Sequence, residues 1–257
     1  MEKIIQCGNI FFSYNGTEVL KGINFSVSPG EMVGILGANG AGKSTLLKIL
    51  SGLLLPDSGE TLYRSKELLK LGRKELAKRL AYIPQDPVFA FPFTVTETVL
   101  MGRAPYIGRF EFEREEDRKI AQRAMETVGI THLKDRLISQ VSAGERQLAS
   151  LARALVQEPE IMILDEPATF LDVRHRTEIM KILIRLKEER GISIVAATHD
   201  IFSALYYFEE IKILKDGAIF AEGKTKTVVT EDILSAAYGI NVRVKKDKGR
   251  VFVFPSD

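Results

Sequence analysis

Residues 37–45 read GANGAGKST, and this glycine-rich stretch constrains the fold more than any other part of the sequence. It matches the spacing Gly-x4-Gly-Lys-Ser and lies between the apolar run MVGIL and the helix-like run LLKILSGL. A strand, a glycine-rich loop and a helix in this order form a phosphate-binding loop, because successive backbone N–H groups face the phosphate oxygens. The sequence therefore predicts an α/β fold that binds a nucleoside triphosphate.

Each residue type in this loop has a chemical role. Gly37, Gly40 and Gly42 let the backbone curl around the phosphates, since glycine tolerates positive φ. Lys43 reaches the β- and γ-phosphates, and the hydroxyl of Ser44 is a Mg²⁺ ligand. The other loop positions that we expect to contact the nucleotide are Asn39, Ala41 and Thr45.

Two further apolar runs, IMIL at 161–164 and ISIVAA at 192–197, are unbroken rather than alternating. Strands that are buried on both faces have this pattern, which favours a mainly parallel sheet surrounded by helices. The N-terminal region differs, because two alternating runs joined by Asn15 and Gly16 predict an antiparallel pair of strands. Residues 61–68 are expected to extend that small antiparallel sheet.

The segment after residue 86 changes character and contains no strand-like run. Ile120, Ala124 and Val128 recur at i, i+4 and i+8 in a charge-rich stretch, which predicts an amphipathic helix. Near the C-terminal end, two Asp- and Gly-containing turns, one of them at Asp216 and Gly217, predict hairpins. The predicted division of the chain is a core of residues 1–86 and 158–240, an inserted helical subdomain of residues 87–157 and a C-terminal β-hairpin of residues 241–257.

Composition excludes several classes of protein. Among 257 residues, 36 Lys and Arg balance 34 Asp and Glu to a net charge of +2, so nucleic acid is not expected as the main partner. The single cysteine, Cys7, excludes an internal disulfide framework and a cysteine-based metal site, and fits a reducing cytosol. No stretch approaches the roughly 18–20 apolar residues that span a bilayer, and the N-terminus does not resemble a signal peptide. Any membrane role is therefore expected to be peripheral.

Asp165 and Glu166 follow the apolar run at 161–164. Ligands of an open parallel sheet bind beyond the carboxyl ends of its strands, so Asp165 is expected to face the Mg²⁺ ion. Glu166 is then a candidate general base for the attacking water. The competing interpretation is a pair of solvated acids at the end of a strand.

Two more polar residues follow predicted strands. His199 comes after the run at 192–197 and is expected to donate to the γ-phosphate or to position the attacking water, the alternative being a simple strand-end cap. Gln85, in YIPQDP, offers an amide oxygen to Mg²⁺ or water, the alternative being a solvated loop residue. The other two histidines, His132 and His175, are predicted to be surface residues.

Residues 141–147 read VSAGERQ and precede the helix-like run LASLARALVQ. Ser142 and Gly144 therefore lie at a helix start, where free backbone N–H groups and the positive end of the helix dipole favour an anion. The sequence thus predicts a second anion-binding helix start in the same chain.

Taken in order, GANGAGKST, Gln85, VSAGERQ, IMILDEP, Asp172 and His199 resemble the motifs of the ATP-binding-cassette family over roughly residues 3–240. The resemblance implies a P-loop NTPase core with a mainly parallel sheet, an N-terminal antiparallel β-subdomain and an inserted helical subdomain. It also implies that Tyr14 stacks on adenine, that Asp172 helps couple two facing sites, and that Gln85 contacts Mg²⁺ and links to a membrane partner. In such a homodimer, Ser142 and Gly144 of one subunit cap the γ-phosphate that the other subunit holds.

The chain departs from the family pattern at four positions. The usual signature is Leu-Ser-Gly-Gly-Gln, whereas this chain has Val141, Ala143 and Glu145 at its first, third and fifth positions. Ala143 narrows backbone freedom, and Glu145 is expected to point away from an anionic ligand. Phe170 replaces a smaller residue before Leu171, which predicts a bulkier interface.

Residues 94–106 and 236–244 are similar to the ATPase subunits of importers for iron–siderophore, haem and cobalamin complexes or metal oxyanions. This similarity implies an ATPase that uses ATP and Mg²⁺ at the cytoplasmic face of the cell membrane, with integral membrane permease subunits and, through them, a substrate-binding protein. The alternatives are a soluble cassette ATPase of iron–sulfur cluster assembly and a non-hydrolytic regulatory module. Three aromatic residues are candidates to line a groove for a permease helix, namely Phe89, Phe91 and Phe93. Core packing is the favoured alternative for at least two of them.

Overall fold

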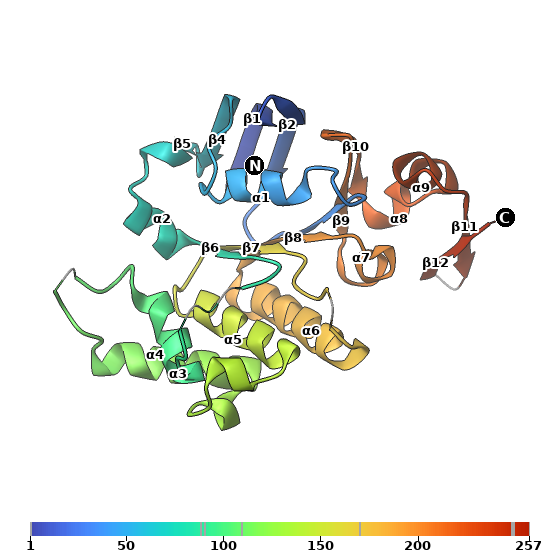
Figure 1. The fold of residues 1–257 in the computed structure, drawn as a ribbon. Coiled ribbons are helices and arrows are strands. Elements are labelled where there is room, and N and C mark those ends of the chain that lie inside the picture. Colours follow the sequence, from blue (N-terminus) through green and yellow to red (C-terminus); the bar gives the residue numbers. More distant parts are fainter. Residues whose placement is uncertain are drawn as a thin grey trace. The chain divides into compact units, whose positions relative to one another are not determined.

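The protein forms two compact units in the computed structural model, Met1–Lys70 with Ser193–Asp257 as the first unit and Leu71–Ile192 as the second. This division by contacts does not follow the predicted subdomain boundaries, which stay a prediction. Figure 1 shows the course of the chain through both units. The structure describes residues 2–87, 89, 91–108, 110–169, 171–247 and 250–256.

The first unit contains the predicted N-terminal antiparallel sheet, with the order β2-β1-β4-β5. Asn15 and Gly16 connect β1 to β2 and both have positive φ, 49° and 82°, as a tight hairpin turn requires. Tyr14 pairs with Thr17 across this turn, so both the predicted hairpin and its extension by a further strand are confirmed. The strands are β1 (Ile5–Tyr14), β2 (Thr17–Val27), β4 (Ser58–Tyr63) and β5 (Lys66–Glu67), and the short helix η1 (Leu68–Lys70) follows.

The first unit also contains parallel strands. The strand β3 (Met32–Leu36) is fully buried and pairs in parallel with β8 (Ser193–Thr198) on one side and β9 (Glu210–Lys215) on the other. The hairpin partner of β9, β10 (Ala218–Lys224), runs antiparallel to it. Helix α1 (Lys43–Leu50) follows β3 and contacts β1, β2 and β8, so the glycine-rich loop joins a buried strand to a packed helix.

The C-terminal part of the first unit consists of three short helices and a second hairpin, which is confirmed as an antiparallel pair. Its turn at residues 248 and 249 lies outside the described part of the chain. The hairpin is tied to the preceding helix, because the Ser235 hydroxyl accepts a hydrogen bond from the Val242 amide at 3.2 Å. These elements are α7 (Ile201–Tyr207), α8 (Thr225–Val228), α9 (Glu231–Tyr238), β11 (Val242–Asp247) and β12 (Arg250–Pro255).

The second unit is mainly helical, with one pair of parallel strands, β6 and β7. The predicted amphipathic helix is α4, in which Ala124 and Val128 are buried and Ile120 is half-buried. Helix α5 lies beside α3, α4 and α6 and forms the centre of this helical layer (Figure 1). The elements are α2 (Arg73–Arg79), β6 (Leu80–Ile83), α3 (Val95–Leu100), η2 (Met101–Arg103), α4 (Glu115–Val128), η3 (Thr131–Leu133), η4 (Ile138–Gln140), α5 (Ala143–Leu155), β7 (Ile161–Asp165) and α6 (Val173–Arg190).

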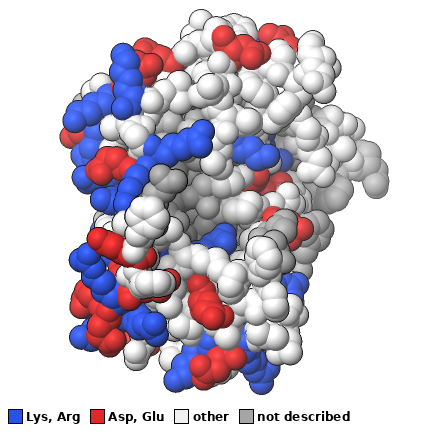
Figure 2. All heavy atoms as spheres, turned by 60° about the vertical axis from the view of Figure 1, so that its left-hand side comes forward, with Lys and Arg blue, Asp and Glu red and all other residues white. Residues whose placement is uncertain are grey.

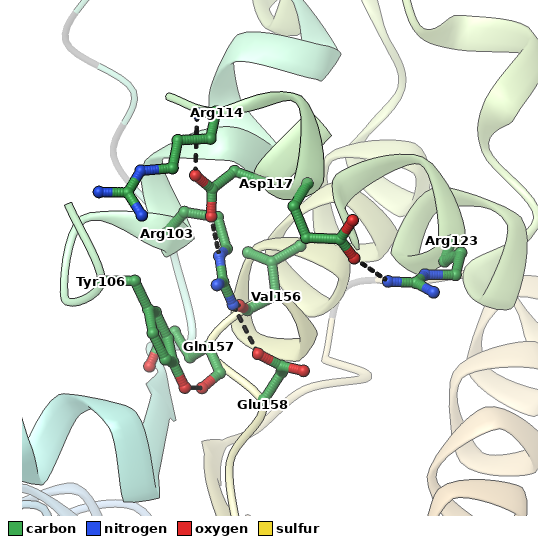
Figure 3. A network of polar contacts seen from close by, with 9 residues as sticks. Arg103, Tyr106, Arg114, Asp117, Arg123, Val156, Gln157 and Glu158 are labelled. Carbon is green, nitrogen blue, oxygen red and sulfur yellow. Dashed lines mark hydrogen bonds and ion pairs between the residues drawn. The ribbon is translucent and has the colours of Figure 1, made fainter. Parts of the chain in front are cut away.

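A buried arginine holds the C-terminal end of α5 (Figure 3). The Arg103 guanidinium donates to Asp117 Oδ1 at 2.8 Å, and to the Val156 carbonyl and Glu158 Oε2 at 2.7 Å each. Its central carbon lies 3.8 Å from the centre of the Tyr106 ring. Because Val156 follows the last residue of α5, this network fixes the helix against the segment before α4 and against the start of α4.

No helix in the described part of the chain is long and apolar enough to cross a membrane. On the face that Figure 2 shows, basic and acidic side chains lie intermixed, mostly toward the left and the bottom of the view. This distribution agrees with the net charge of +2.

Candidate nucleotide-binding site

The glycines of the phosphate loop adopt the backbone conformations that glycine favours. Gly37, Gly40 and Gly42 have φ values of 156°, 82° and 100°. A Cβ atom at Gly37 would lie 2.5 Å from the Leu214 carbonyl oxygen, and one at Gly42 would lie 2.8 Å from a methyl group of Leu20. A side chain at Gly37 or Gly42 would therefore clash with the first unit as well as strain the backbone.

The lysine of the loop is held inside it. Lys43 is only 5% exposed, and its ammonium donates to the carbonyls of Gly37 at 2.9 Å and Ala38 at 3.2 Å. Lys43 is also the first residue of α1, whose leading N–H groups have no partner within the helix. The loop thus combines a fixed cation with amides at the positive end of a helix, which fits a triphosphate. Of the other loop residues, Asn39 is exposed, Ser44 is half-buried, and Ala41 and Thr45 are buried.

Two other predicted residues of the first unit remain accessible. Tyr14 is 44% exposed at the end of β1, and its ring contacts Phe12 edge-on at a centroid distance of 4.7 Å. His199 is exposed directly after β8. Asp200 then caps α7 by accepting hydrogen bonds from the amides of Phe202 and Ser203. The capping residue at this position is therefore Asp200, and His199 is an exposed residue directly before it.

The two carboxylates of the second unit are buried, Asp165 at 4% and Glu166 at 8% exposure. The Tyr82 hydroxyl lies 3.4 Å from Asp165 Oδ2. Glu166 Oε2 accepts hydrogen bonds from the Thr169 hydroxyl at 2.9 Å and from the Gln85 amide at 3.4 Å. The interpretation as two solvated acids is therefore wrong, and Gln85 contacts the candidate base.

Glu166 lies in a tight turn directly after β7. It has a positive φ of 47°, a conformation that costs about 1–3 kcal/mol in a non-glycine residue and that occurs preferentially at functional sites. The Thr169 amide donates to the Glu166 carbonyl at 3.2 Å, which closes a four-residue turn. Pro167 occupies the second position of this turn, where its fixed φ favours the bend.

The second helix start carries a reciprocal cap. The Ser142 hydroxyl accepts from the Glu145 amide at 3.3 Å, while Glu145 Oε2 accepts from the Ser142 amide at 2.7 Å. Hydrogen bonds from the backbone and hydroxyl of Ser142 lower the pKa of the Glu145 carboxyl. Glu145 thus bends back to cap the start of its own helix, and the expectation that it points away from an anionic ligand stays a prediction. The Ser-x-x-Glu spacing was the sequence signal for this cap.

Packing within the chain itself requires a glycine at position 144. A Cβ atom at Gly144 would lie 2.6 Å from the ring of His175, which is half-buried. His175 thus lies at the surface with about a quarter of its side chain exposed (25%), and His132 is exposed as predicted. Asp172 caps α6 by accepting from the His175 amide at 2.8 Å, and its carboxylate also contacts His175 Nδ1 at 3.0 Å. Ala143 is exposed in helical conformation, so its methyl group meets no obstacle.

The remaining aromatic predictions have mixed outcomes. Phe89 and Phe93 are half-buried and Phe91 is 65% exposed, so core packing of two of the three is wrong. An arginine, Arg153, lies 5.4 Å from the Phe89 ring centre. Phe170, the predicted interface residue, lies outside the described residues.

Three predicted residues have the donor chemistry that Mg²⁺ prefers. Ser44 in the first unit carries a hydroxyl oxygen, and Gln85 and Asp165 in the second unit carry an amide and a carboxylate oxygen, all of them hard ligands. In the described part of the chain, no cluster of three or more His, Cys, Asp or Glu residues could hold a metal by itself. A few protein oxygens together with nucleotide phosphates match the usual Mg²⁺ site, whereas an all-protein cage does not.

A glycine loop that encloses a buried lysine at a helix start, in a chain that also carries two buried carboxylates at a strand end, defines a P-loop ATPase. Comparison with known proteins gives the family. The family model for the ABC transporter matches residues 20–169, and the chain belongs to this family. The protein is therefore an ATPase of the ABC transporter family, and the predicted fold is confirmed.

Three individual similarities refine this picture. The iron(3+)-hydroxamate import ATP-binding protein of Bacillus subtilis (strain 168) is 35% identical over 234 residues, 91% of this chain and 87% of that protein. An inward-facing transporter described as of metal-chelate type has a TM-score of 0.86 and 27% identity, covering 99% and 98% of the two chains. A dimeric ATP-binding cassette bound to ADP and Pi has a TM-score of 0.76 and 30% identity, covering 86% and 98%.

Proposed function

We propose that the protein is the ATP-hydrolysing subunit of a membrane importer for a metal chelate, of the kind that includes iron–siderophore, haem and cobalamin complexes, or for a metal oxyanion. The similarity to an iron(3+)-hydroxamate import protein carries this proposal. It extends over 91% of this chain and 87% of that protein. The structural likeness to a metal-chelate transporter supports it independently. The alternative of iron–sulfur cluster assembly has no support in these comparisons.

We infer the following roles for the site residues. Lys43 and the amides of the phosphate loop bind the phosphates, and Tyr14 stacks on adenine. Ser44 and Gln85 would ligate Mg²⁺ and Asp165 would hold it through water, and the ion when bound would neutralise charge on the phosphate oxygens. The complete set of nucleotide contacts in the loop is Gly37, Asn39, Gly40, Ala41, Gly42, Lys43, Ser44 and Thr45.

The reaction needs a proton acceptor for the attacking water. Glu166 takes this proton while the water oxygen forms a bond to the γ-phosphorus. The bond between that phosphorus and the β–γ bridging oxygen breaks, and the products are ADP and phosphate. His199 donates a hydrogen bond to the γ-phosphate. The buried carboxylate of Glu166 supports this assignment, because its hydrogen bonds hold it in one orientation.

We propose a homodimer in which Ser142 and Gly144 of each subunit complete the site of the other, and in which Asp172 helps couple the two facing sites. The dimeric state of a similar cassette with ADP and Pi supports this arrangement. Integral membrane permease subunits at the cytoplasmic face of the membrane, and through them a substrate-binding protein, complete the transporter.

Co-purification and transport test the proposal. The chain is expressed with the permease genes that adjoin its own gene, and uptake of ⁵⁵Fe-labelled hydroxamate siderophore, haem and cobalamin into proteoliposomes is measured with ATP on the side of this subunit. ATP-dependent uptake of one metal chelate supports the proposal. Association with iron–sulfur assembly proteins and with no membrane protein contradicts it.

The Glu166→Gln variant tests the roles within the site. We expect it to bind ATP, to hydrolyse it at least about 100-fold more slowly, and to accumulate as a dimer, because the γ-phosphate stays in place. Light scattering with ATP measures the dimer and phosphate release measures the rate. A monomer under these conditions contradicts the dimer, and a wild-type rate removes Glu166 from its role.

A further inference from the structure

Thr169 contacts the candidate base through two of its groups. Its amide closes the turn by donating to the Glu166 carbonyl at 3.2 Å, and its hydroxyl donates to Glu166 Oε2 at 2.9 Å. The geometry points to Thr169 as a positioning residue for Glu166, an inference that rests on the proposed role of Glu166 as general base. Thr169 touches Glu166 rather than the reacting atoms, so it acts through the orientation of the carboxylate.

The carboxylate of Glu166 needs a neighbouring group to hold it in one orientation. Glutamate has three rotatable bonds, and a general base accepts a proton only within hydrogen-bond reach of its donor. Glu166 is 8% exposed, so little bulk water is available to hold its carboxylate. A hydrogen bond from a hydroxyl that is itself fixed by the same turn restricts the rotation of Oε2 and thereby of the whole carboxylate.

The second donor to Oε2 is weaker. The Gln85 amide lies 3.4 Å away, at the long end of hydrogen-bond distances, on an exposed residue after β6. Gln85 is also proposed to contact Mg²⁺, so its amide has a competing task. Thr169 is separated from Glu166 by only two residues, and its shorter contact therefore depends on the local turn alone.

The experiment removes the hydroxyl without changing the shape of the side chain. We expect Thr169→Val to lower kcat for ATP hydrolysis about 10- to 100-fold, the loss typical of a misplaced reacting group. KM and the Kd for ATP should change less than about twofold, because the phosphate contacts are untouched. Thr169→Ser keeps the donor and should restore kcat to within about threefold of the wild type. Thr169→Ala replaces Thr169→Val if the latter does not fold.

Thr177→Val is the matched control. The Thr177 hydroxyl donates to the Val173 carbonyl at 2.7 Å within α6. The same substitution therefore removes a hydrogen-bonded threonine hydroxyl that does not contact Glu166. Its kcat should equal that of the wild type.

The two proposals fail in different ways. If Glu166→Gln hydrolyses ATP at the wild-type rate, the role of Glu166 is wrong. If Glu166→Gln is inactive while Thr169→Val retains kcat, the role of Thr169 is wrong and that of Glu166 stands. A serine variant as slow as the valine variant, or a loss of ATP affinity as large as the loss of kcat, also overturns the positioning role.

Discussion

The ring of His175 fills the space that a side chain at Gly144 would need. The two residues lie 31 positions apart in the chain, on α5 and α6, and the contact distance of 2.6 Å to an added Cβ leaves no room for a methyl group. The glycine is therefore required by packing between these helices as well as by any ligand at the helix start. The Asp172 carboxylate fixes the imidazole from the other side, at 3.0 Å from Nδ1.

Replacing this glycine should destabilise the fold. We expect Gly144→Ala to lower the free energy of unfolding by about 1–3 kcal/mol, because the methyl group must displace the ring. Urea denaturation measures the change. Adding His175→Ala should recover part of the loss, so that the double variant is more stable than the sum of the single effects. A Gly144→Ala protein as stable as the wild type would show that the ring moves without cost.

At the scale of elements, the network around Arg103 joins three segments. It connects the residue after α5, the first turn of α4 and the η2 turn, with side-chain exposures of 7% for Arg103 and 9% for Asp117. The close approach of η2 to α5 shows the same tight packing, because a Cβ at Gly102 would lie 2.1 Å from the Arg153 carbonyl oxygen. The orientation of α5 thus depends on a buried charge that its own sequence does not contain.

Removing this charge should have a large effect. Arg103→Ala leaves the buried Asp117 without its ion-pair partner, and we expect a loss of about 3–5 kcal/mol in unfolding free energy. Arg123→Ala is the matched control, since Arg123 pairs with Glu116 at the surface with 64% and 65% exposure, and we expect a change below about 1 kcal/mol. Guanidinium chloride denaturation compares them. Equal effects of the two substitutions would contradict a buried pair.

The same network predicts how stability depends on pH. Burial raises the pKa of Asp117, but hydrogen bonds from the Arg114 amide and the Arg103 guanidinium outweigh burial and leave the pKa below its usual value of 3.8. The folded protein then binds this proton more weakly than the unfolded chain, so the stabilisation is present above pH 4 and is lost as pH falls through the folded pKa.

Denaturation at a series of pH values checks this dependence. Unfolding free energy should fall more steeply below about pH 4 in the wild type than in Asp117→Asn, which has no carboxyl to protonate. Identical slopes for the two proteins in this range would exclude Asp117 as a source of acid sensitivity.

At the scale of the whole molecule, nucleotide binding should raise the stability of the folded protein. A ligand that binds only the folded state stabilises it by about 2.7 kcal/mol at 100 times its Kd. We expect ATP with Mg²⁺ to raise the Tm of the wild type and of Arg123→Ala, and to leave Lys43→Ala unchanged, because Lys43 is the fixed cation of the phosphate loop. A full shift in Lys43→Ala would contradict that role.

The features that could be predicted from the sequence are those that depend on residues close together in the chain. The phosphate loop, the buried strands and the hairpin at Asn15 and Gly16 each follow from a few consecutive residues with a fixed chemical requirement. Contacts between distant segments could not be predicted, because His175 against Gly144 requires the packing of α5 on α6. The contact between Thr169 and Glu166 was accessible in principle, since Pro167 marks the turn, but a turn alone does not say which hydroxyl will meet the carboxylate.

The turn from Glu166 to Thr169 closes over four residues. Its closure therefore costs little chain entropy, because the loop that must close is short. The end of β7 thus carries both its bend and a hydrogen-bond donor for its carboxylate within four consecutive residues.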